Sequence, residues 1–216
     1  MKKYLIALFL IVFITDLSFA QEEKKNNESK FGINGGISYS KLRGNDLIEE
    51  SKADLGLLIG ISFEHYLNEN FSIKTNLNFE TKVVRNENTY YGIDYILDAR
   101  TKASHKYLVM PIMVKYNFGN NKNFFVNGGP FVGFLLKASS KTSGYPDDDF
   151  SDLYKKTDFG LSIGLGTKII LNEKHDLNIE VRENLGLSNI SDAPVYNDGT
   201  LKTNSFNLIL NWDFGI

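Results

Sequence analysis

Histidine, serine and clustered aspartate are the residue types with which this chain could catalyse a reaction or bind a metal. His105 follows Ser104 directly, but adjacent residues on a strand point to opposite faces, so this pair is badly placed to share a hydrogen bond. His65 and His175 are expected near the other end of the fold. Because nucleophilic and acid-base catalysis need groups within hydrogen-bonding distance, we expect no catalytic residue and no enzymatic activity. A lipid A-modifying enzyme that uses His105 is the alternative.

An acidic segment, GYPDDDFSD at residues 144–152, contains Asp147, Asp148, Asp149 and Asp152. Carboxylate oxygens are the ligands that Ca²⁺ prefers in proteins. The segment lacks the glycine and the terminal glutamate of a regular calcium-binding loop. We therefore favour a solvated acidic loop over a Ca²⁺ site, and we expect no metal and no cofactor. A divalent bridge to the phosphates of lipopolysaccharide is the weaker alternative.

The elements that must position these residues begin after an N-terminal leader. Residues 1–20, MKKYLIALFLIVFITDLSFA, have two lysines, an apolar run and a small-residue end, which indicates a secretory signal peptide. The apolar run is shorter than the ~20 residues that a membrane-spanning helix needs. Residues 21–30 are polar and lack aromatic side chains, so we predict a flexible periplasmic leader. The folded domain is expected at residues 31–216.

Composition excludes several classes of protein. The chain has no cysteine, so an exported fold would be held without disulfides and a lipoprotein anchor is excluded. The net charge is −2 with both signs interspersed, which argues against a nucleic-acid partner. Beyond the leader no apolar run is long enough for a spanning helix. A closed β-barrel is then the remaining way for the chain to cross a membrane.

From residue 31 onward, apolar and polar residues alternate with a period of two, which indicates strands. Eight segments are predicted, at residues 31–41, 53–67, 71–84, 106–118, 123–137, 158–171, 176–187 and 203–214. Short links (68–70, 119–122, 172–175) alternate with long ones (42–52, 85–105, 138–157, 188–202). We interpret 85–105 as the largest loop, although TYYGIDYIL within it could extend the flanking strands. The alternation of short and long links predicts an all-β, eight-stranded antiparallel up-and-down transmembrane β-barrel with its short turns in the periplasm.

The two faces of the strands indicate which solvent the apolar face meets. Phe159, Leu161, Ile163 and Leu165 share one face, and the opposite face is mostly glycine and serine. Small residues on the polar face suit a narrow, tightly curved wall rather than an open solvated sheet. Lipid-facing bands of barrels are flanked by aromatic belts. We predict an inner belt of Phe31, Phe63, Phe71, Tyr116, Phe118, Phe124, Trp212 and Phe214, and an outer belt of Tyr39, Phe79, Phe134, Phe159 and Phe206.

Charged residues at the strand positions that face inward are expected to contact one another inside the barrel. The interior of an eight-stranded barrel is just wide enough for side chains to fill, so inward charges must neutralise one another. We predict a polar network that plugs the lumen, built from Glu64, Lys74, Lys115, Lys168, Glu180, Arg182 and Asp213. Glu80, Lys82 and Lys137 are expected inside as well, nearer the extracellular end. A narrow, porin-like diffusion channel is the alternative.

A family pattern is visible in YLVMPIMVKYNFG (107–119), FFVNGGPFVGFLL (124–136) and NIEVRENLGLSNI (178–190). With the signal peptide, these stretches resemble the small outer-membrane β-barrel proteins of Bacteroidota, known as porin-family or outer membrane protein beta-barrel domain proteins. The resemblance covers the whole mature chain and implies an eight-stranded barrel without a general catalytic motif. Glu183 departs from it, because an aromatic residue is expected there. Glu183 also lies on the outward parity and Pro130 interrupts a strand; a β-bulge could explain either.

We therefore expect a monomer in the outer membrane that has a structural or interaction role through its extracellular loops. The expected partners are outer-membrane lipid and lipopolysaccharide, together with a protein partner that the sequence cannot identify. No nucleic acid is expected.

Overall fold

The computed structural model describes residues 29–45, 51–91, 96–142, 146–172, 174–195 and 199–215, with side chains omitted between 87 and 100. The predicted signal peptide and most of the leader lie outside these residues. The described part consists almost entirely of strands: β1 Ser29–Arg43, β2 Lys52–Tyr66, β3 Phe71–Tyr91, β4 Ile96–Phe118, β5 Phe124–Thr142, β6 Asp148–Asp149, β7 Thr157–Ile170, β8 His175–Gly186 and β9 Lys202–Gly215. A short 3-10 helix, η2 (Ser151–Leu153), follows β6.

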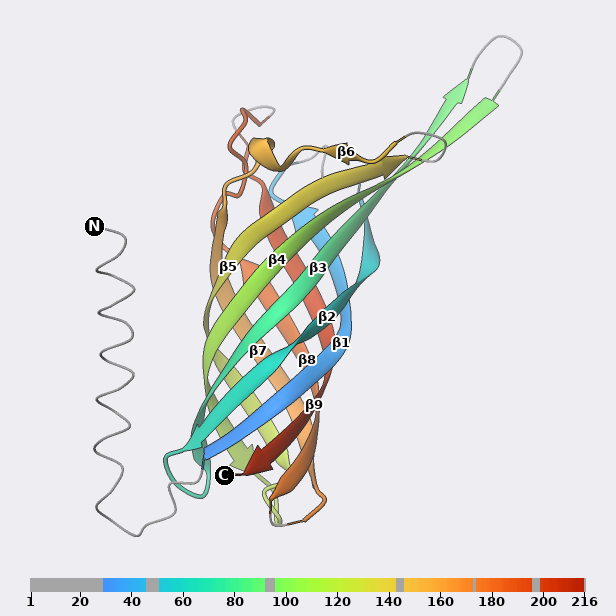
Figure 1. Ribbon diagram of the computed structural model, residues 1–216. Coiled ribbons are helices and arrows are strands. Elements are labelled where there is room, and N and C mark those ends of the chain that lie inside the picture. The colour runs from blue at the N-terminus through green and yellow to red at the C-terminus, as the bar shows by residue number, and fades with distance from the viewer. Residues whose placement is uncertain are drawn as a thin grey trace.

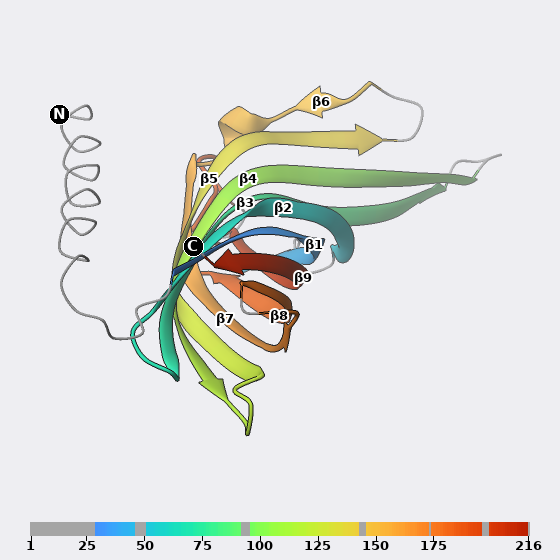
Figure 2. The same cartoon turned by 60° about the horizontal axis from the view of Figure 1, so that its bottom comes forward.

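Eight of these strands close into a barrel (Figure 1). Each strand pairs antiparallel with its neighbours in the order β4-β3-β2-β1-β9-β8-β7-β5, and pairing between β4 and β5 closes the ring. The two-residue β6 is an addition that pairs with β5 beyond the end of β7. The short turns lie at the same end as the C-terminus, and Figure 2 turns this end toward the viewer. The predicted eight-stranded antiparallel barrel is confirmed.

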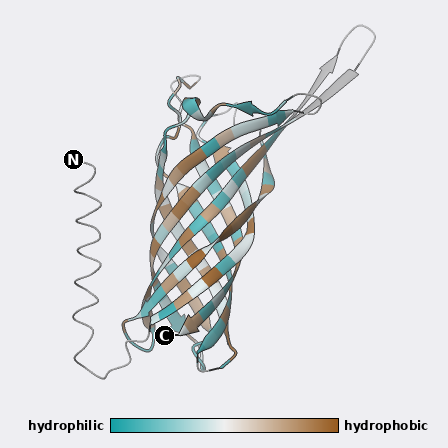
Figure 3. Ribbon diagram, viewed as in Figure 1, coloured by the Kyte–Doolittle hydropathy of each residue, from teal (hydrophilic) through white to brown (hydrophobic). Residues whose placement is uncertain are grey.

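The outer surface of the barrel is apolar. Figure 3 shows hydrophobic and hydrophilic residues alternating along the strands, as the period of two requires. Leu57, Ile163 and Leu165 have 71%, 66% and 63% of their surface exposed. A protein dissolved in water rarely exposes so many large apolar residues on one continuous surface. The exterior therefore meets lipid, and the polar side chains face the interior.

Aromatic side chains lie at both ends of this apolar band. In the inner belt, the Phe71 and Tyr116 rings are 4.9 Å apart and the Phe118 and Phe124 rings are 6.0 Å apart, measured between centroids. In the outer belt, Phe134 and Phe159 are half exposed on the outer surface. The ten residues from Phe124 to Phe134 rise by about 25 Å at ~3.3 Å per residue and a tilt of about 40°. This separation matches the height of a lipid-facing band.

The segment 85–105 is mostly strand, so its interpretation as a large loop is wrong. β3 continues to Tyr91 and β4 begins at Ile96, and the two stay paired up to Tyr91↔Ile96. The resulting hairpin extends well beyond the barrel in Figures 1 and 2. A hairpin outside the membrane needs only cross-strand hydrogen bonds and not the apolar alternation that the lipid imposes. Without that alternation, the sequence pattern could not distinguish strand from loop.

Neither residue that broke the strand pattern lies in a bulge. Around Glu183 the register is continuous on both sides, with Ile163 on β7 and Phe206 on β9 as its cross-strand partners. The register between β4 and β5 is also constant past Pro130, although pairing is missing between Pro111↔Phe131 and Val114↔Gly128. Proline has no N–H to donate, which accounts for the missing pairs. Glu183 is a carboxylate on the lipid-facing surface, and nothing in the structure explains it.

The end of the barrel opposite the short turns is covered by an apolar cap. We use this name for two clusters of buried side chains: Tyr107, Val109, Phe131, Leu135 and Ala138 with Phe150 and Tyr154; and Leu42, Val84, Ile190 and Leu201 with Ala103 and Tyr154. Tyr154 contacts both clusters. Backbone hydrogen bonds from Lys155 to Ile190 (2.8 Å) and from Asp192 to Leu153 (2.9 Å) tie the two contributing loops together.

Candidate functional site

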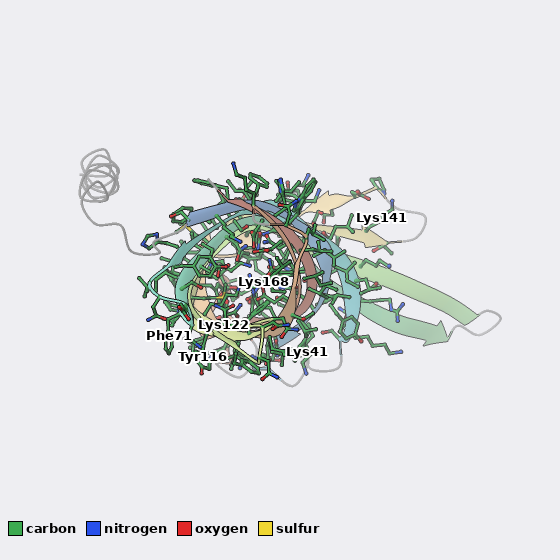
Figure 4. The ribbon with its side chains drawn as sticks, turned by 90° about the horizontal axis from the view of Figure 1, so that it is seen from below. Lys41, Phe71, Tyr116, Lys122, Lys141 and Lys168 are labelled. Atoms are coloured by element: carbon green, nitrogen blue, oxygen red, sulfur yellow. The ribbon has the colours of Figure 1, made fainter. Side chains whose placement is uncertain are left out.

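The candidate site is the polar interior of the barrel, where alternation along every strand places the inward side chains. Six of the seven predicted network residues are buried with at most 1% of their surface exposed: Glu64, Lys74, Lys115, Glu180, Arg182 and Asp213. Lys168 is half-buried, and its Nζ lies 5.7 Å from the centroid of the Tyr66 ring. Figure 4 places Lys168 within the outline of the barrel, seen from below.

The half of the barrel nearer the short turns contains an ion pair between β2 and β4. Lys115 Nζ donates to Glu64 Oε2 at 2.9 Å, and Ser72 Oγ donates to Glu64 Oε1 at 2.7 Å. The Lys115 ammonium also lies 4.3 Å from the centroid of the Phe125 ring, within range of a cation–π interaction. Lys74 is the cross-strand partner of Glu64, but its Nζ has no hydrogen-bond partner among the described residues. The single carboxylate thus faces two ammonium groups.

A second ion pair lies on β8. Arg182 Nε donates to Glu180 Oε1 at 2.7 Å, and Asn127 Nδ2 donates to the same oxygen at 2.9 Å. Gly164 on β7 makes room for this group, since a Cβ at that position would lie 2.6 Å from both Asn127 Oδ1 and Glu180 Oε1. The glycines on the polar face of β7 therefore accommodate side chains from the neighbouring strands.

Neutral groups surround the third predicted carboxylate. Asp213 accepts hydrogen bonds from Ser62 Oγ at 3.1 Å and from Asn178 Nδ2 at 2.7 Å. Asn211 also donates to it. Hydrogen bonds to an ionised carboxylate are stronger than those between neutral groups, so these donors hold the charge without a cation in contact.

The sequence interpretation missed two acidic members of the interior. Asp158 is buried and accepts from Thr203 Oγ1 at 2.6 Å, from Ser188 Oγ at 3.1 Å and from Lys82 Nζ at 3.5 Å. Asp176 pairs with Lys30 at the end with the short turns. The sequence contained the necessary information. Asp158 and Asp176 each lie next to an apolar residue that faces the lipid, so on a strand each must point inward.

Opposite charges balance inside the barrel. The buried charged residues among those described are five cations, Lys30, Lys74, Lys82, Lys115 and Arg182, and six carboxylates, Glu64, Glu80, Asp158, Asp176, Glu180 and Asp213. The half-buried Lys168 brings the cations to six, so the two signs cancel. Glu80 accepts from Ser38, Asn184 and Ser205 rather than from a cation.

Lys137 does not face the interior, so that prediction is wrong. The register shifts between Lys106 and Tyr107, which pair with Lys137 and Leu135. Leu136 and Lys137 are consequently both exposed, whereas Ala138 is buried. An extra residue in one strand reverses the direction of every side chain that follows it.

The histidines are not brought together. His105 is 1% exposed inside the barrel, with its ring 4.7 Å from that of Tyr154 and 6.1 Å from that of Phe150, whereas Ser104 faces outward. This position lies beyond the outer belt, and burial there, with the nearby Lys82 charge, lowers the pKa of His105 to about 4. His65 and His175 lie at the end with the short turns, beside Ser29 and Trp212.

The described acidic loop residues do not form a metal cluster. Within the described part of the chain, no group of three or more histidine, cysteine, aspartate or glutamate side chains is arranged to hold an ion. Asp149 instead accepts from Ser151 Oγ at 2.7 Å and lies 3.6 Å from Lys137 Nζ. The hydrogen bonds from Ser151, with a smaller effect of Lys137, lower the pKa of Asp149 below its usual value.

No helix among the described residues is long and apolar enough to span a membrane.

Comparison with known families identifies the barrel. Residues 19–192 match the family model described as outer membrane protein beta-barrel domain. The chain belongs to this family. Membership, together with the apolar exterior between two aromatic belts, places the protein in the outer membrane. The family name does not specify a ligand or a reaction.

Solved structures of similar architecture come from several bacteria. Neisserial surface protein A is 15% identical, with 85% of this chain and 96% of that chain covered and a TM-score of 0.44. OprG from Pseudomonas aeruginosa is 17% identical (89% and 99% covered, TM-score 0.43). Ail of Yersinia pestis, in complex with the heparin analogue sucrose octasulfate, is 12% identical (87% and 99% covered, TM-score 0.42). No curated protein matches the sequence.

Proposed function

We propose that this outer-membrane barrel is a non-enzymatic structural or interaction protein whose lumen is plugged by its own polar side chains. The observation that carries the proposal is the cancellation of six inward cations by six inward carboxylates. A pore that selects ions would line its lumen with an excess of one sign or with open water. Neutral pairing inside a narrow barrel closes the lumen instead.

The size of the interior supports the plug. An eight-stranded barrel is just wide enough for its side chains to fill it. Arg182, Tyr107, Lys74, Lys115 and Phe125 are the largest side chains that are fully buried. The apolar cap adds a second closure at the extracellular mouth, where Ile190 is buried completely. A solute would have to displace both.

The second candidate function is a narrow diffusion channel. It is favoured by buried polar atoms that have no hydrogen-bond partner in the described structure, among them Lys74 Nζ, Arg182 Nη1 and Nη2, and the side-chain amide of Asn76. Such donors and acceptors are suited to bind water or a small polar solute. The two candidates differ in whether the ion pairs separate to let a solute pass.

Conductance in planar bilayers distinguishes these two functions. The purified protein is inserted beside a porin that verifies insertion under the same conditions. The plug predicts no steady current above the background of the membrane. Stable single-channel steps from the wild-type protein would refute the plug and support the channel.

The non-enzymatic part of the proposal depends on Ser104 and His105, which point to opposite faces of β4. The apolar cap also separates His105 from the outer leaflet, where a lipid substrate would lie. Incubation with lipid A, followed by mass spectrometry, tests this part. A modified lipid that disappears with His105→Ala would contradict it.

Several further features belong to the same proposal. Residues 1–20 are removed as a signal peptide and residues 21–30 form a periplasmic leader to a barrel that occupies residues 31–216. The protein is a monomer, its source is a member of the Bacteroidota, and its extracellular loops contact lipopolysaccharide or a protein partner. Mass spectrometry of the protein extracted from outer membranes checks the first point, because the mature chain should begin at Gln21.

A further inference from the structure

Between two well hydrogen-bonded parts of the lumen lies a layer of polar side chains that we call the central layer. On the side of the apolar cap, Glu80 accepts hydrogen bonds on both carboxylate oxygens. On the side of the short turns, Glu64 and Asp213 also accept on both oxygens. The central layer consists of the polar inward residues between these groups on β1, β3, β5, β8 and β9: Asn34, Lys74, Asn76, Asn78, Asn127, Glu180, Arg182 and Asn207.

Hydrogen-bond partners are missing throughout the central layer. Each of its residues is at most 4% exposed and has at least one side-chain nitrogen or oxygen without a partner in the described part of the chain. The charged donors among these atoms are Lys74 Nζ and the Arg182 nitrogens Nη1 and Nη2. Asn34, Asn76 and Asn207 have neither amide atom paired. Because buried polar groups are almost always satisfied by protein, water or an ion, this layer is suited to a ligand.

The central layer contains more positive than negative charge. Its cations are Lys74 and Arg182, and its carboxylate is Glu180. Arg182 Nε and Asn127 Nδ2 both donate to Glu180 Oε1, whereas Oε2 has no partner and is therefore not bonded to Lys74. The carboxylates on either side are each satisfied on both oxygens by groups outside the layer. The cancellation of charge over the whole lumen therefore does not hold within the central layer.

The two cations lie in the same part of the lumen, although β3 and β8 are not neighbours in the barrel. The Lys74 ammonium interacts electrostatically with Glu180, to which Arg182 is hydrogen-bonded. Lys74 Nζ also lies 5.9 Å from the centroid of the Phe125 ring. A Cβ at Gly166, the cross-strand partner of Glu180, would lie 2.5 Å from Cζ of that ring. Lys74 and Arg182 can thus serve one ligand.

The donors of the central layer suit an anion better than a water molecule. Ammonium and guanidinium groups only donate hydrogen bonds, whereas water must donate as well as accept. An anion accepts only, and it also compensates the excess positive charge, which is costly to bury alone. The interior of an eight-stranded barrel is just wide enough for its side chains, and Figure 4 shows side chains throughout it. This crowding favours a single-atom ion over a larger solute.

We propose that the central layer binds a small monovalent anion, chloride or an ion of similar size, between Lys74 and Arg182. Asn76 follows Lys74 at the next inward position of β3, and Asn207 is the cross-strand partner of Arg182. The amide N–H groups of these two asparagines are further donors to the anion. The bound anion is then a component of the plug, so this inference deepens the proposed function and rests on it.

Stability in different salts tests the inference. The full chain is unfolded with urea in lipid vesicles, either in sodium chloride or in sodium gluconate of the same ionic strength. Gluconate has the same charge as chloride but is too large for the lumen. Chloride at about ten times its dissociation constant should raise the ratio of folded to unfolded protein about tenfold, because it binds only the folded state. Equal ratios in the two salts would overturn the inference.

Single substitutions locate the effect. Lys74→Gln should lose the dependence on chloride, whereas Lys174→Gln, which removes the same charge from an exposed turn, should keep it. Asn76→Asp adds a carboxylate next to Lys74 in place of the bound anion. This variant should be more stable than the wild type in gluconate and should not respond to chloride. A chloride response that persists in both Lys74→Gln and Asn76→Asp would refute the proposed site.

Diffraction provides a test that depends on no variant. In crystals of the wild type grown with bromide, anomalous scattering should place a bromide ion in contact with Lys74 Nζ and the Arg182 guanidinium. Water alone in the central layer, or a direct contact between Lys74 and Glu180, would contradict the proposal. A barrel that neither conducts nor responds to chloride would keep the plug and overturn only this inference, whereas steady conductance would refute the plug itself.

Discussion

At the scale of single residues, the interior of the barrel depends on charges that cannot leave it. Arg182 and Glu180 are both excluded from solvent, and each compensates the charge of the other at 2.7 Å. Asn127 donates a second hydrogen bond to the Glu180 carboxylate. A buried ion pair contributes little compared with a well-packed apolar pair, but a buried charge without its partner is costly. The two residues are therefore best regarded as one unit.

Removal of one partner should destabilise the protein more than removal of both. Arg182→Ala should lower the free energy of unfolding by about 3–5 kcal/mol, because the Glu180 carboxylate remains buried without a cation in contact. Urea-induced unfolding in lipid vesicles, followed by tryptophan fluorescence, measures the change.

The double variant Arg182→Met/Glu180→Gln is the control for this prediction. It removes both charges and roughly keeps the side-chain volumes, so it should be clearly more stable than Arg182→Ala. A double variant as unstable as the single one would show that packing volume, rather than charge, dominates at this position.

At the scale of elements, every barrel strand separates lipid from the lumen by alternation alone. On β7 the outward side chains Phe159, Leu161, Ile163 and Leu165 are all more than half exposed. The inward Gly164 lies against Glu180 and Asn127 of the adjacent strands. Ile61, Leu77 and Leu208 occupy equivalent outward positions on β2, β3 and β9. The same strand thus provides apolar surface to the bilayer and space to the polar interior.

The lipid face should respond to charge according to depth. Leu165→Arg places a guanidinium near the middle of the apolar band and should cost about 2–4 kcal/mol, because the bilayer cannot solvate it. Leu171, which is 56% exposed just beyond the end of β7, is the matched control. Leu171→Arg should cost at most about 1 kcal/mol near the interface. Unfolding titrations in vesicles compare the two, and equal costs would disprove the depth assignment.

At the scale of the whole molecule, the two ends of the barrel differ in construction. One end has short turns, and the other has the long β3–β4 hairpin, β6, η2 and the apolar cap. Short periplasmic turns and longer extracellular loops are typical of outer-membrane barrels. The apolar cap is therefore assigned to the outside of the cell.

Labelling of single cysteines tests this orientation. The chain has no cysteine of its own, so each variant provides one reactive thiol. Asp152→Cys in η2 should react with a membrane-impermeant maleimide on intact cells, whereas Asn121→Cys in the turn between β4 and β5 should react only after the outer membrane is permeabilised. The reverse pattern would invert the barrel.

The sequence alone determined the strands and their two faces, because both follow from alternation along the chain. It also determined the closed barrel, because short and long links alternate between the strands. The eight predicted segments match the barrel strands within a few residues, apart from the extracellular extensions of β3, β4 and β5. Direction relative to the lumen was also predictable for Glu64, Lys115 and Arg182. These properties are local, since a period of two fixes the face of every residue as long as no extra residue interrupts the strand.

Only the tertiary structure decided the properties that depend on pairing between strands. The register shift at Lys106 turned Lys137 outward, and the folding of a loop brought Phe150 and Tyr154 over His105. The contact between Lys82 and Asp158 joins residues far apart in the chain. Register is set by the summed hydrogen bonds and packing of adjacent strands, and no single strand encodes it.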